Sequence, residues 1–104
     1  MAIRSPAHAA FGRAVREIRH ERRLSQEGLA FECGLDRTYL SGIERGVRNP
    51  SLANVFRLAA ALGVRPIELF ARAEAEASHL ETGAAPPKAA ALPGAGAVRA
   101  KVTS

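Results

Sequence analysis

Cysteine, tryptophan and tyrosine are nearly missing from this sequence of 104 residues, which has one cysteine, no tryptophan and one tyrosine. The lone Cys33 excludes an intrachain disulfide framework and a cysteine-based zinc cluster, and it favours a reducing compartment. Aromatic residues amount to only 5%, fewer than a β-sandwich or barrel normally uses, whereas abundant alanine, arginine and leucine favour helices. The length has room for one small domain, which we expect to be all-α.

Long apolar runs and motifs for catalysis or metal binding are also missing. Charged residues interrupt the first twenty residues, and no stretch of about 18 apolar residues occurs, so we expect a cytoplasmic protein with no membrane partner. The three histidines are widely spaced, and the sequence has no glycine-rich phosphate loop or nucleophile motif. We therefore predict no metal, no cofactor and no enzymatic activity. Cys33 is expected to be a small core residue rather than a redox switch.

Acidic residues are fewer than basic ones, at 10 against 15, and the net charge is +5. Residues 1–50 contain nine basic and six acidic residues, whereas residues 51–81 contain three and four. The excess positive charge ahead of the tail thus lies in the first half, which suits a polyanionic partner such as double-stranded DNA. The last stretch is Ala/Gly/Pro-rich and has no acid, so we expect a solvated flexible tail, with a basic DNA-contacting arm as the alternative.

Helix signals divide the chain into an N-terminal extension with the start of the first helix (1–10), a folded domain (11–80) and a disordered tail (81–104). Capping residues bound five expected helices, at residues 6–23, 26–33, 37–45, 52–62 and 66–79. The expected N-caps are Ser5, Ser25, Asp36 and Ser51, and the expected glycine stops are Gly34, Gly46 and Gly63. The fourth helix carries an apolar side made of Leu52, Val55, Leu58, Ala59 and Leu62.

The second and third helices are separated only by Gly34, Leu35 and Asp36. A short turn that contains glycine joins two helices at a steep angle, which is the helix-turn-helix arrangement. The apolar positions of this unit serve packing and leave a polar face on the third helix, made of Arg37, Thr38, Ser41, Gly42 and Arg45. Such a face is basic at its N-terminal end and is suited to a DNA major groove.

The segment LSQEGLAFECGLDRTYLSGIERGVRNPSL, residues 24–52, resembles the helix-turn-helix of phage repressor and Cro-type regulators. It is particularly similar to restriction-modification controller proteins, through the SQ pair, the A-x-x-x-G turn and the I-E-R-G segment. The resemblance extends from about Phe11 to Phe70. It implies a five-helix lambda-repressor-like domain that regulates transcription by binding operator DNA as a homodimer.

The resemblance implies that Gln26, in the first turn of the second helix, contacts a DNA phosphate. Arg37 can pair with guanine and Thr38 with thymine, with phosphate contact or a solvated face as the alternatives. Tyr39 is also a candidate DNA-binding residue with a mixed role: its ring is expected to pack under the helix while its hydroxyl reaches backbone. Ser41 and Gly42 lie one turn further on, and Gly42 either lets the backbone approach DNA or omits one base contact. Phosphate contact, with a solvated loop as the alternative, is expected for Arg45, Arg48 and Asn49.

Two further expectations concern structure and assembly. In similar proteins an arginine of the first helix pairs with the glutamate of the E-R-G segment, which implies a structural ion pair between Arg19 and Glu44. A dimer contact is expected on the last two helices at Phe56, Ile67 and Phe70, with ordinary core packing as the alternative. A second function remains open: an antitoxin-like protein that neutralises a protein partner and regulates its own operon.

Overall fold

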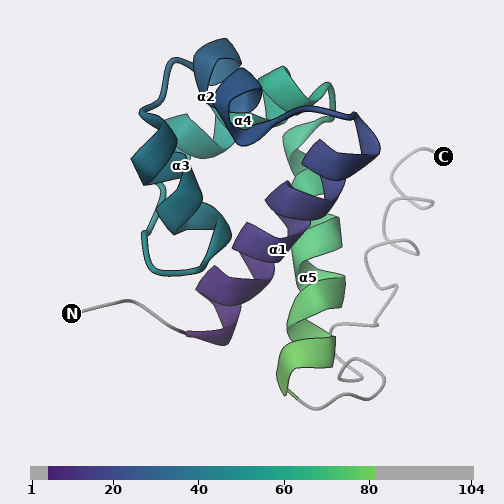
Figure 1. The fold of residues 1–104 in the computed structure, drawn as a ribbon. Helices are drawn as coiled ribbons and strands as arrows, with labels where there is room; N and C mark the ends of the chain where they lie inside the picture. Colours follow the sequence, from purple (N-terminus) through teal and green to yellow (C-terminus); the bar gives the residue numbers. More distant parts are fainter. Residues whose placement is uncertain (1–4, 82–104) are drawn as a thin grey trace, which may run out of the picture.

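The computed structural model describes residues 5–81, which form five helices and no strand (Figure 1). The helices are α1 (Pro6–Glu21), α2 (Gln26–Cys33), α3 (Arg37–Glu44), α4 (Leu52–Leu62) and α5 (Pro66–Glu81). The all-α, five-helix prediction is therefore confirmed. The last helix is two residues longer than expected and includes Glu81, the first residue of the predicted tail; the rest of that tail, from residue 82 onward, lies outside the described residues.

Local capping chemistry explains where the helices begin. Each of the four predicted N-caps accepts a backbone hydrogen bond from the first turn of its helix, and Asp36 accepts two, from the amides of Thr38 and Tyr39 at 2.9 and 3.2 Å. These contacts satisfy amide groups that have no partner within the helix. Gly34 and Gly63 end α2 and α4 in the left-handed conformation, with φ of 69° and 75°.

The end of α1 was predicted two residues too late because no glycine marks it. Arg23 adopts φ of 59°, which is unusual for a residue with a side chain. Its amide donates to the His20 carbonyl, and the Leu24 amide donates to the Arg19 carbonyl, both at 3.0 Å. This pair of hydrogen bonds is the Schellman motif, which glycine normally completes. The end of α3 differs by one residue, because Arg45 is its C-cap rather than its last helical residue.

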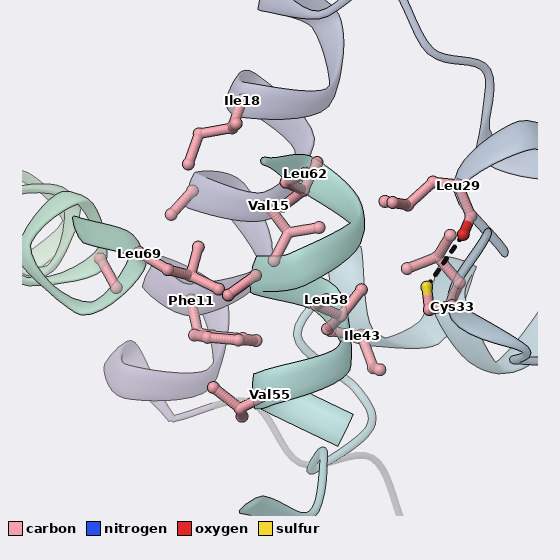
Figure 2. Packing of buried hydrophobic residues seen from close by; sticks show 14 of the residues in the cluster. Phe11, Val15, Ile18, Leu29, Cys33, Ile43, Val55, Leu58, Leu62 and Leu69 are labelled. Carbon is pink, nitrogen blue, oxygen red and sulfur yellow. Dashed lines mark hydrogen bonds between the residues drawn. The ribbon is translucent and has the colours of Figure 1, made fainter. Parts of the chain in front are cut away.

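The core is built from apolar side chains of all five helices (Figure 2). Its fully buried large members are Val15, Leu29, Leu40, Ile43, Leu58, Leu62 and Leu69. Cys33 is buried among them, as expected, and its thiol donates to the Leu29 carbonyl at 2.9 Å. Burial raises the pKa of the Cys33 thiol.

Helix α1 is the centre of the arrangement, with α5 packed along one side and α3 on the other (Figure 1). An exposed ion pair at 2.9 Å, between Arg72 of α5 and Glu21 of α1, adds to the apolar contact of these two helices. Hydrogen bonding from Arg72 lowers the pKa of the Glu21 carboxyl. No helix in the described part of the chain has the length and apolar character that crossing a membrane requires.

Leu52 begins the apolar side of α4 but is not buried with the rest of that side. Leu52 is 69% exposed, because the first turn of α4 borders an open hollow between α1, α4 and α5 instead of filling the core. Phe31 of α2 is also exposed, which the sequence pattern did not predict. Both residues therefore add apolar surface rather than core volume.

Candidate nucleic-acid interface

Helices α2 and α3 form a helix-turn-helix unit, in which α3 lies on the side of α1 away from α5 and α2 packs against α4 (Figure 1). The turn is closed by the left-handed Gly34 and by a hydrogen bond of 2.9 Å from the Leu35 amide to the Ala30 carbonyl. Asp36 caps α3 directly after this turn, so the connection between the two helices is short. This geometry leaves Arg37 and Thr38 exposed at the start of α3, as predicted.

A buried ion pair fixes the far end of α3. Arg19 of α1 donates from Nε and Nη2 to the Glu44 carboxylate, at 2.7 and 3.0 Å, and from Nη1 to the Leu24 carbonyl at 2.9 Å. The two side chains are only 9% and 3% exposed. The structure thus forms the pair that was expected, with two parallel hydrogen bonds that restrict its orientation.

Gln26 extends this ion pair toward the surface. Its Nε2 donates to Glu44 Oε1 at 2.9 Å, and its Oε1 accepts a longer hydrogen bond of 3.4 Å from Arg37 Nη1. Because Glu44 can only accept, the contact determines which end of the Gln26 amide faces Arg37. The first residue of α2 is therefore joined to both ends of α3. An exposed contact of 3.8 Å between Arg37 Nε and Glu27 adds little.

Gly12 holds α1 close to the end of α3, a role that the sequence reading missed. A Cβ atom at this position would overlap the Ile43 carbonyl oxygen and come within 2.5 Å of the Glu44 carbonyl oxygen. Only glycine permits this approach of a helix to a backbone. The available signal was a glycine inside a strongly periodic helix, where glycine is unfavourable without a packing reason.

Tyr39 lies half-buried against the core, which agrees with the expected packing of its ring. The Tyr39 hydroxyl accepts a hydrogen bond of 3.3 Å from Asn54 Nδ2, and the expectation that this hydroxyl reaches backbone stays a prediction. Asn54 stands in the first turn of α4, where Ser51 caps its backbone amide. The contact links α3 to α4 through side chains.

The prediction that Gly42 faces outward is wrong. Gly42 is buried, because the stem of Arg48 lies over it and occupies the position of a side chain. Arg48 itself is exposed, as is Asn49 beside it in the loop after α3. The loop therefore folds back over α3 and covers part of the face that was expected to be open.

A hollow of about 200 Å³ lies beside α3, where α1, α2 and α3 meet. Arg16, Ser41 and Arg45 line it together with the network of Gln26 and Glu44. Arg45 Nε donates to Ser41 Oγ at 3.4 Å. Arg16 and Arg45 are both exposed. Arg16 was not predicted for this site. Its position in the sequence, one turn before Arg19, becomes informative only once α1 is known to pass beside α3.

The three residues expected at a dimer contact are exposed on a different part of the surface. Phe56 lies on α4, and Ile67 and Phe70 lie on α5, with Ile67 65% exposed. Phe70 also packs its ring 6.2 Å from that of Phe11 and borders an apolar hollow of about 610 Å³ between α1 and α5. Ile67 and Phe70 lie away from the polar face of α3, since α1 lies between α3 and α5 (Figure 1).

Residues 5–81 contain no cluster of histidine, cysteine, aspartate or glutamate that could hold a metal ion. Two helices joined by a tight turn, with a basic polar face on the second, define the helix-turn-helix class of DNA-binding proteins. Residues 15–69 match the family model described as helix-turn-helix. The chain belongs to this family, on the branch of the restriction-modification controller proteins.

Three relatives illustrate the likeness. Control protein C.BamHI of Bacillus amyloliquefaciens is 57% identical over 61 residues, which are 58% of this chain and 75% of that protein. The controller protein C.AhdI of Aeromonas hydrophila is 55% identical in a structural match with a TM-score of 0.59, covering 60% of this chain and 94% of that one. The controller protein C.Esp1396I, solved as a tetramer with its natural 35-base-pair operator, is 33% identical with a TM-score of 0.66, over 70% and 96% of the two chains.

Proposed function

We propose that this protein is a sequence-specific transcriptional regulator of the controller type, which binds operator DNA as a homodimer and catalyses no reaction. The observation that carries the proposal is the exposed, basic start of α3 on a helix whose other end is fixed by the buried Arg19–Glu44 pair, with Gln26 linking that pair to Arg37. The N-terminal residues of a recognition helix are the ones that meet base edges in the major groove. The operator complex of C.Esp1396I supports the same use of the fold.

Roles follow from chemistry and position. Arg37 offers two parallel donors to guanine, and Thr38 offers a hydroxyl and a methyl group, the latter suited to thymine. Gln26 lies beside Arg37, contacts Glu44, and approaches a phosphate when DNA docks. The cations and polar groups around α3 contact further phosphates, and these are Arg16, Ser41, Arg45, Arg48 and Asn49.

The homodimer is part of the proposal because one short helix reads only a few base pairs. Two recognition helices related by a two-fold axis read half-sites about 10 base pairs apart and require a nearly palindromic operator. Phe56, Ile67 and Phe70 are exposed on α4 and α5 and provide apolar surface for such a contact. Burial there also adds stability to a small core.

Mapping of the genomic fragments that the purified full chain binds tests the proposal. The expected result is a small set of sites that share one nearly palindromic motif upstream of genes. Binding without a shared motif would contradict a sequence-specific regulator. No observation on residues 5–81 supports the antitoxin-like alternative, and the three relatives described above do not support it either.

A further inference from the structure

The side chain of Arg48 lies across α3 because Gly42 has none. After α3 the chain turns at Gly46, whose φ is 77°, and the amides of Val47 and Arg48 both donate to the Gly42 carbonyl, at 2.9 and 3.2 Å. A Cβ atom on Gly42 would overlap Arg48 Cγ and would lie 3.4 and 3.5 Å from Arg48 Cβ and Cδ. Any larger residue at position 42 would therefore displace the Arg48 stem.

The guanidinium of Arg48 has no partner among residues 5–81, although the aliphatic part of the side chain packs against α3. Arg48 is exposed, and its guanidinium forms no hydrogen bond or ion pair with another residue within 5–81. Two other arginines of this interface differ, since Arg37 donates to Gln26 and Arg45 donates to Ser41. A packed stem with a solvated head loses less conformational freedom on binding than a fully mobile side chain does.

We propose that Gly42 is a positioning residue for DNA binding: the space left by its missing side chain holds the Arg48 stem over α3 and presents the guanidinium to a DNA phosphate. The inference rests on the proposed function, because it assumes that DNA docks on α3. It also explains why a residue that disfavours helices stands inside a helix of eight residues. The advantage of glycine at position 42 is the space that it leaves for the Arg48 side chain.

The test compares Gly42→Ala, Arg48→Ala and the double variant in equilibrium titrations. The probes are a duplex that carries the motif found by genomic mapping and a scrambled duplex of equal length, each measured at several salt concentrations. Arg48→Ala should weaken both complexes by at least roughly tenfold. It should also reduce the steepness of the salt dependence by about 0.9 per protomer, because one phosphate contact is lost.

Gly42→Ala should reproduce both changes, and adding it to Arg48→Ala should change nothing further. Gly28→Ala is the matched control, because Ser25 Oγ at 3.2 Å is the only atom near a Cβ there. Circular dichroism checks that each variant remains folded. If the overlap unfolds Gly42→Ala, the double variant should fold again, since shortening Arg48 removes the Cγ and Cδ contacts; a double variant that stays unfolded would contradict the packing of the Arg48 stem on Gly42.

Each remaining outcome contradicts either the inference or the proposed function. If Arg48→Ala weakens binding and Gly42→Ala does not, the positioning role is wrong while the proposed function stands. If the double variant binds more weakly than Arg48→Ala alone, Gly42 acts by another route and the inference is again wrong. If Arg48→Ala changes neither affinity nor salt dependence, Arg48 has no phosphate contact and needs no positioning. If the wild-type chain binds neither duplex, the proposed function itself fails.

Discussion

The amide of Gln26 donates to Glu44 Oε1 at 2.9 Å, so the first residue of α2 is tied to the last residue of α3. Glu44 is held from the other side by Arg19 of α1. One buried carboxylate thus joins the three helices that shape the nucleic-acid interface. This arrangement fixes the angle at which α3 projects before any DNA is present, which reduces the cost of ordering it on binding.

Glu44→Ala should reduce the free energy of unfolding by about 3–5 kcal/mol, because it leaves the buried guanidinium of Arg19 without its partner. Urea denaturation followed by circular dichroism measures the change. The matched control is Glu21→Ala, which removes an exposed pair with Arg72 and should leave the midpoint almost unchanged. Equal midpoints for wild type and Glu44→Ala would show that the pair contributes nothing to stability.

Gly12→Ala should destabilise the domain by at least about 1–3 kcal/mol, because the added methyl group meets backbone carbonyls that cannot move aside easily. Thermal unfolding provides the measurement. Gly28→Ala is the control with the same chemical change in a neighbouring helix, and it should cost less, because the added methyl group would approach only a side-chain oxygen, Ser25 Oγ, at 3.2 Å. A Gly12→Ala variant that melts with the wild type would mean that α1 and α3 are less closely packed than described.

Salt should weaken DNA binding steeply. Contacts from Arg16, Arg45 and Arg48 in two protomers release counterions, and the slope of log affinity against log salt should be about −3 to −6 per dimer. Fluorescence anisotropy between roughly 50 and 200 mM salt measures it. An affinity that stays constant over this range would rule out an interface made of these cations.

Ile67→Glu should give a folded monomer that binds its operator much more weakly, because a charge is placed in the proposed apolar contact. Light scattering should report a wild-type mass near twice the chain mass of 11.0 kDa and a variant mass near 11.0 kDa. Phe31→Glu changes an exposed apolar residue of α2 and should leave the dimer intact. A monomeric wild type that binds a single half-site tightly would contradict the dimer.

Features with a local cause could be predicted from the sequence. The capping serines, Asp36, and the glycines after α2 and α4 act within a few residues, so the helices were located nearly residue by residue. The end of α1 was missed because Arg23 takes a conformation that glycine usually takes. The Arg19–Glu44 pair came from the resemblance, since 25 residues separate its members and periodicity does not connect them.

Features that depend on tertiary approach could not be predicted. Gly12 and Gly42 are both explained by atoms from distant or returning segments, which only the folded chain brings near. The same holds for Arg16, which reaches the interface because α1 passes beside α3. Leu52 fits the apolar side of α4 by spacing but projects beyond the packed part of that helix. Helical periodicity identifies the apolar face of a helix, but it does not show how far along that face the neighbouring helices pack.

The central claim, that the start of α3 reads DNA sequence, is tested most directly by the ratio of affinities for the mapped operator and a scrambled duplex. We expect the wild type to prefer the operator by about a thousandfold or more. Arg37→Ala should reduce that ratio by roughly tenfold or more, because a lost contact to guanine costs about 1–3 kcal/mol. Arg57→Ala, on the exposed surface of α4, should leave the ratio unchanged. Equal affinity of the wild type for both duplexes, or an equal loss on both with Arg37→Ala, would contradict the account.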